Sequence, residues 1–141
     1  MKIVLLFISV WILFSFRSEK SGDVLVDITG INFSKKGNLV IGLFKETGFP
    51  KTDQSSYGKI VAISSPTMTV KFSKITAGTY AIAVIQDKDK NGKLSTNMVG
   101  YPIELYGFSN NKYGTFGPPA FKDVSFEVKE SQTSHLKIQI R

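Results

Sequence analysis

The sequence predicts an all-β protein that folds as one domain, and three observations support this class. From Asp23 onward, apolar and polar residues alternate with a period of two, which is the spacing of side chains on one face of a strand. Clusters of Gly, Pro, Asn and Ser separate the alternating stretches, as turns do. The length of 141 residues, 42% of them hydrophobic, suits one domain with its own core.

Seven stretches are the candidate strands, at residues 23–29, 38–45, 59–63, 67–72, 79–86, 124–128 and 136–140. The stretch 79–86 is apolar on both faces, which predicts a central strand. Ser34–Asn38 and Lys129–Ser134 have the composition of hairpin turns between neighbouring strands. Together these features predict a single antiparallel β-sandwich of about seven strands, of the immunoglobulin or transthyretin-like kind.

The N-terminal residues 1–22 have a different character. Lys2 is followed by the apolar run Ile3–Phe16, which is too short for a comfortable membrane span and suits the core of a signal peptide. We expect an exported protein, in the periplasm, at the cell surface or outside the cell, cleaved between Phe16 and Gly22. An uncleaved N-terminal anchor is the alternative, and would be its only membrane contact. Residues 23–141 form the sandwich domain in either case.

Composition excludes several classes of function. The chain has no cysteine, so it has no disulfide, no thiolate metal site and no lipid-modified cysteine. The net charge is +7, but the lysines are dispersed and Arg141 is the only arginine after the leader, which argues against nucleic-acid binding. We therefore expect a partner in the envelope or outside the cell, whose identity stays open.

The segment from Asp87 to Lys122 is too long for an ordinary connection. It contains six aromatic residues, which disfavours disorder, so we expect an ordered cap over one end of the sandwich without a strand of its own. Five of these rings are candidates for stacking on an envelope glycan or peptide, namely Tyr101, Tyr106, Phe108, Tyr113 and Phe116. Core packing is the alternative, and the Gly and Pro residues between the rings favour it.

The start of this segment has the spacing of a calcium-binding loop. Oxygen donors recur at alternate positions: Asp87, Asp89, Asn91, the carbonyl of Lys93, and Ser95 in the ninth place. The twelfth place, where a glutamate is usual, holds Met98, so we expect the distant Glu104 to complete a Ca²⁺ site with Asp87, Asp89, Asn91 and Lys93. The alternative is a polar turn in which Asn91 and Gly92 supply positive φ angles.

Enzyme signatures are weak, and we predict a non-enzymatic protein. His135 is the only histidine, which leaves a serine triad or a histidine-based zinc site little to use. Ser109 lacks the strand–turn–helix context of a nucleophile elbow. Asp87, Asp89 and Glu104 could form the carboxylate pair of a glycosidase, but ligand spacing explains the same residues better.

Several motifs together resemble one bacterial domain-of-unknown-function family of small exported proteins. They are Gly78-Thr-Tyr80, the run from Asp87 to Leu94, Gly100 with Pro102 and Glu104, Tyr106-Gly-Phe-Ser109, and Pro119 with Phe121. The resemblance implies an exported sandwich similar to transthyretin-like or carboxypeptidase-regulatory modules, without an established activity. The family pattern has Asn at position 89, Asp at position 95 and Gly at position 105, where this chain has Asp89, Ser95 and Leu105.

Overall fold

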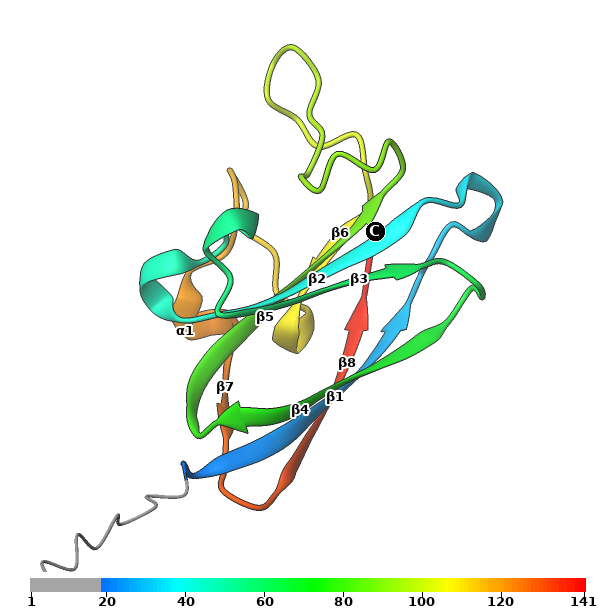
Figure 1. Ribbon diagram of the computed structural model, residues 1–141. Helices are drawn as coiled ribbons and strands as arrows, with labels where there is room; N and C mark the ends of the chain where they lie inside the picture. Colours follow the sequence, from blue (N-terminus) through cyan, green and yellow to red (C-terminus); the bar gives the residue numbers. More distant parts are fainter. Residues whose placement is uncertain (1–18) are drawn as a thin grey trace, which may run out of the picture.

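The computed structural model describes residues 19–141, which form two packed β-sheets (Figure 1). The eight strands are β1 (Ser21–Thr29), β2 (Asn38–Phe44), β3 (Tyr57–Ala62), β4 (Met68–Thr76), β5 (Gly78–Asp87), β6 (Tyr106–Phe108), β7 (Ser125–Val128) and β8 (Thr133–Gln139). The helical elements are η1 (Phe33–Lys35), η2 (Glu46–Gly48), η3 (Thr52–Gln54), η4 (Ser109–Asn111) and α1 (Phe121–Val124). The predicted all-β, sandwich-like class is confirmed. The predictions for residues 1–18 fall outside the described range.

One sheet has the strand order β4-β1-β8, and the other has the order β3-β2-β5-β6, with β7 also paired to β5. β6 pairs with Ala83–Ile85 of β5, and β7 pairs with Gly78–Ala81, so these two short strands pair with opposite halves of β5. β5 is therefore the central strand that its two apolar faces predicted. Among residues 19–141, no helix is long and apolar enough to cross a membrane.

Three details of the sequence-based topology are wrong. The long segment after Asp87 does contain a strand, the short β6, which brings the number of strands to eight. The sandwich is not wholly antiparallel, because β8 runs parallel to β1. The links Ser34–Asn38 and Lys129–Ser134 are not hairpins, since each joins strands of different sheets. Turn composition shows where a chain reverses, but it does not show which sheet the next strand will join.

The main core lies between the two sheets. On β5, Tyr80, Ile82 and Val84 point into it, and β1 and β8 contribute from the opposite sheet. The fully buried members include Val24, Val26, Ile28, Leu39, Leu43, Ile82, Val84 and Ile138. The period of two along β1, β2 and β5 is the sequence signature of this inner face.

A second core covers the other face of β5. Ala81 and Ala83 pack there against Phe44, Phe108 and Val124. Phe49, Tyr106, Tyr113 and Phe121 pack around them, in edge-on ring contacts such as Phe49–Phe108, whose centroids lie 5.7 Å apart. Much of the predicted cap is thus part of a folded core rather than a loop above it.

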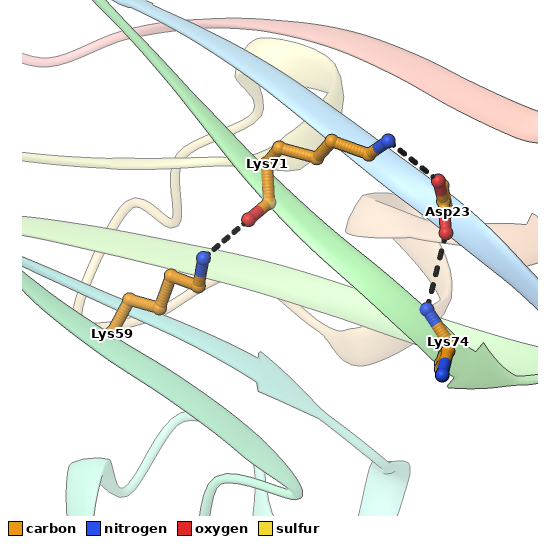
Figure 2. A network of polar contacts seen from close by, with 4 residues as sticks. All are labelled: Asp23, Lys59, Lys71 and Lys74. Atoms are coloured by element: carbon orange, nitrogen blue, oxygen red, sulfur yellow. Dashed lines mark hydrogen bonds and ion pairs between the residues drawn. The ribbon is translucent and has the colours of Figure 1, made fainter.

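A polar network on strands β1, β3 and β4 links the two sheets (Figure 2). Asp23 on β1 forms an ion pair with Lys71 at 2.8 Å and accepts the backbone N–H of Lys74 at 3.1 Å. These two hydrogen bonds, from Lys71 and then from Lys74, lower the pKa of Asp23. On the other side, the Lys59 ammonium on β3 donates to the Lys71 carbonyl on β4. The edge of one sheet is thereby fastened to the other.

Candidate cation site

The candidate site begins where β5 ends. Asp87 is the last residue of β5 and its side chain is buried. Its two carboxylate oxygens accept the backbone N–H groups of Asn91 at 3.1 Å and Gly92 at 2.8 Å. Lys90 and Gly92 adopt positive φ angles of 60° and 75°, which turn the loop back toward Asp87. Nothing lies within 4 Å of a Cβ built at Gly92, so backbone conformation, not space, favours glycine there.

Glu104 closes the loop from a distance of seventeen residues along the chain (104 − 87). Its side chain is only 4% exposed. One carboxylate oxygen accepts the Lys88 N–H at 2.7 Å, and the other accepts the Ser95 N–H at 3.0 Å. The carboxylate thus joins the beginning of the loop to its end. One oxygen each from Asp87, Asp89 and Glu104 lie within 4.8 Å of one another.

Asp89, Asn91 and Ser95 form a hydrogen-bonded triangle on the open side of the loop. Asp89 accepts the Asn91 amide N–H₂ and the Ser95 hydroxyl, both at 3.0 Å. The Asn91 amide also donates to Ser95 Oγ at 2.9 Å. Lys93 takes part through its backbone N–H, which donates to Asn91 Oδ1 at 2.7 Å. The structure therefore brings Asp87, Asp89, Asn91 and Glu104 together, whereas Lys93 contacts the site through its N–H and not through the carbonyl that the spacing predicted.

Ser95 belongs to the site, although the predicted ligand set does not include it. The ninth place in the spacing of a calcium loop is the signal that points to Ser95. In the structure the Ser95 hydroxyl is in direct contact with Asp89.

The charges of this site are not neutralised by lysine. Among residues 19–141, no ion pair involves Asp87, Asp89 or Glu104, and the Lys88 ammonium is instead bonded to the Ile103 carbonyl at 3.1 Å. Partial desolvation raises the pKa of Asp89, but the hydrogen bonds from the Ser95 hydroxyl and the Asn91 N–H outweigh it and leave that pKa lowered. Asp89 is therefore ionised at neutral pH.

This donor set suits a hard cation. Its atoms are carboxylate and amide oxygens, which Ca²⁺ and Mg²⁺ prefer, whereas zinc sites usually need His or Cys. A carboxylate oxygen that accepts one N–H keeps a second lone pair for a metal. Asn91 would have to turn its amide, because its oxygen faces the Lys93 N–H in this conformation.

The five candidate stacking rings do not share one surface. Tyr106, Phe108 and Tyr113 pack edge-on with one another, with centroids 5.8–6.3 Å apart, and belong to the second core. The Arg141 guanidinium covers the Tyr113 ring at 3.8 Å. Tyr101 and Phe116 are exposed, by 71% and 101%. A flat platform of all five rings is therefore not formed.

The residues considered for catalysis have structural contacts. Ser109 is fully buried, and its hydroxyl accepts the Ile82 N–H at 2.9 Å and donates to the Val124 carbonyl. His135 Nε2 lies 2.8 Å from Asp27 Oδ2 on the outer face of the β4-β1-β8 sheet. Neither one contacts the carboxylates of the candidate site.

The whole candidate site lies within a stretch that matches a known family. Residues 26–135 match the family described as "Uncharacterized protein conserved in bacteria (DUF2141)". The chain belongs to this family. The DUF2141 match spans all of β2 to β7, with the Asp87–Leu94 loop and Glu104 between them. No curated protein and no solved structure matches the chain.

Proposed function

We propose that this DUF2141 protein is an exported, non-enzymatic β-sandwich whose loop region is stabilised by Ca²⁺. The ligands would be Asp87, Asp89, Asn91, the Lys93 carbonyl and Glu104. The observation that carries the proposal is the convergence of three carboxylates within 4.8 Å, two of them buried. Ionised groups this close repel one another, and a divalent cation would turn this repulsion into attraction.

The hydrogen bonds and lysines around the three carboxylates indicate how tightly Ca²⁺ should bind. Asp87 and Glu104 already accept backbone N–H groups, so the loop can fold without metal and gains only part of its order on binding. Three lysines at positions 88, 90 and 93 add a repulsive field for any cation. We expect a Kd on the order of 10⁻⁴–10⁻³ M, which is typical of extracellular calcium modules. Mg²⁺ should bind less well, because it demands a smaller octahedral shell.

A thermal melt with and without calcium tests the proposal. With a Kd of about 0.3 mM, about 2 mM Ca²⁺ should stabilise the fold by roughly 1.2 kcal/mol. For a domain of this size the midpoint should rise by about 3–6 °C over the value in EDTA. Mg²⁺ at the same concentration should give a smaller rise.

Asp89→Ala should abolish the calcium-dependent rise. Asp123→Ala is the matched control, since Asp123 is an exposed carboxylate on α1 that is not part of the cluster, and it should keep the rise. Equal midpoints of the wild type in EDTA and in calcium, with no metal found by elemental analysis, would leave the loop as a polar turn.

Export and binding need separate tests. Cell fractionation with N-terminal sequencing should find a mature chain that starts between Phe16 and Gly22. Recovery of the intact chain from the cytoplasm would contradict export.

Glycan or peptide binding is the second proposal, supported by the exposed rings of Tyr101 and Phe116 alone. Tyr101→Ala should weaken retention on a glycan array if that ring stacks on sugar.

A further inference from the structure

Within residues 19–141, one end of the molecule carries most of the large exposed apolar side chains. Figure 1 shows the loop after β5 projecting beyond both sheets at the top of the view. At its end lie four exposed apolar residues, which we call the apolar tip: Met98, Val99, Tyr101 and Ile103. They are exposed by 105%, 87%, 71% and 54%. Side chains of this kind are scattered singly on ordinary surfaces, whereas four within six residues form a patch.

The apolar tip is a built structure. The Asn97 side-chain oxygen accepts the N–H groups of Val99 at 3.1 Å and Tyr101 at 2.9 Å. The backbone N–H of Asn97 donates to the Tyr101 carbonyl, and that of Ile103 donates to the Ser95 carbonyl. These bonds join the chain entering the tip to the chain leaving it. These bonds satisfy much of the backbone at the tip internally, which lowers the cost of moving it out of water.

The exposed charge at this end of the molecule is mainly positive. Lys90 and Lys93 are exposed on the adjoining loop. Lys35 and Lys36 are exposed on the β1–β2 link, which is fastened to the end of β5 by the Gln86 side chain, bonded to Asn32 and to the Lys36 carbonyl. Of the acidic groups there, Asp87 and Glu104 are buried, whereas Asp89 is exposed, and so is Asp53, which lines the same hollow as Lys93.

From this arrangement we propose that the apolar tip inserts into the surface of an anionic lipid bilayer, with the lysines of this end on the headgroups. Apolar side chains at the tip with lysines on the adjoining loop match the two layers of such a surface, since binding there combines buried apolar area with attraction to anionic lipid. A tyrosine within the patch suits the interface between headgroups and chains. The proposal does not require calcium in the neighbouring loop.

A fluorescent label at the apolar tip tests this in the full chain. The chain has no cysteine, so Val99→Cys gives a single position for an environment-sensitive dye. The apolar run Ile3–Phe16 can enter a bilayer by itself, so the readout must report the tip alone. The measurement is the shielding of the dye from dithionite, in EDTA, on vesicles of equal parts phosphatidylglycerol and phosphatidylcholine. Thr47→Cys, exposed on η2, carries the same dye as the control.

We expect shielding of the dye at position 99 on the anionic vesicles, little on phosphatidylcholine alone, and none at position 47. With Met98→Ser and Tyr101→Ser added, the lipid concentration needed for half-maximal shielding of the dye should rise by at least about tenfold. Lys90→Gln with Lys93→Gln should weaken it by about tenfold as well. Unchanged melts would show that these exposed substitutions leave the fold intact. A dye at position 99 that stays accessible on every vesicle would overturn the proposal and point to a protein partner instead.

Discussion

Glu104 offers the sharpest test of how the loop is held. Its carboxylate accepts the N–H of Lys88 and the N–H of Ser95 while only 4% of the residue is exposed. Glu104→Ala removes both acceptors at once. Each half-buried N–H left without a partner costs about 1–3 kcal/mol. Relief of repulsion with Asp87 and Asp89 offsets part of that, so we expect a net loss of about 2–4 kcal/mol without calcium.

The assay is a thermal melt in EDTA, combined with amide hydrogen exchange. For a domain of this size a loss of about 2–4 kcal/mol lowers the midpoint by roughly 6–20 °C. Exchange of the Lys88 and Ser95 amide protons should accelerate most, because they lose their acceptor. Glu104→Gln keeps one acceptor oxygen and should cost about half as much.

Glu46→Ala is the matched control, since Glu46 is an exposed carboxylate on η2, and it should leave the midpoint within about 1 °C. A midpoint for Glu104→Ala equal to that of the control would refute the reasoning. The Glu104 carboxylate would then contribute nothing to the stability of the metal-free loop.

The remaining predictions concern the fold. Ile82→Ala empties a fully buried position between the sheets, so urea unfolding should show a loss of about 2–5 kcal/mol, whereas a loss below about 1 kcal/mol would contradict the central place of β5. Burial raises the pKa of Tyr80 to about 12, above the ordinary value of 10. The folded state therefore holds this proton more tightly than the unfolded state, and the resulting stability is full below pH 10 and lost as the pH rises toward 12. Unfolding free energies measured across that window should fall more steeply for the wild type than for Tyr80→Phe, and equal slopes would contradict it. Far-UV circular dichroism should be dominated by strand, and a helix content above about a quarter would contradict the sandwich.

The sequence alone predicted the class of fold and the place of its central strand. Alternation of apolar residues is a local property, and it marks the inner face of a strand wherever the strand goes. Tyr80, Ile82 and Val84 could be placed between the sheets for that reason. The turn of the loop after β5 could also be predicted from the sequence, because Asp87, Asp89, Asn91 and Gly92 lie within a few residues of one another.

The tertiary structure decided everything that depends on which distant segments meet. β8 pairs parallel to β1, and the links Ser34–Asn38 and Lys129–Ser134 each cross from one sheet to the other. Both features follow from packing and cannot be predicted from local turn chemistry. Three residues, Tyr106–Phe108, are too few to show a strand period, and their pairing with β5 provides the strand. The place of Glu104 beside the loop could be guessed only by elimination. Its contacts with Lys88 and Ser95 were not predicted, since a carboxylate has no sequence signal for the distant N–H groups that it will bind. Ring packing against Phe44 and Phe49 likewise separated the buried aromatics of the cap from Tyr101 and Phe116, because only the fold determines which rings find a neighbour.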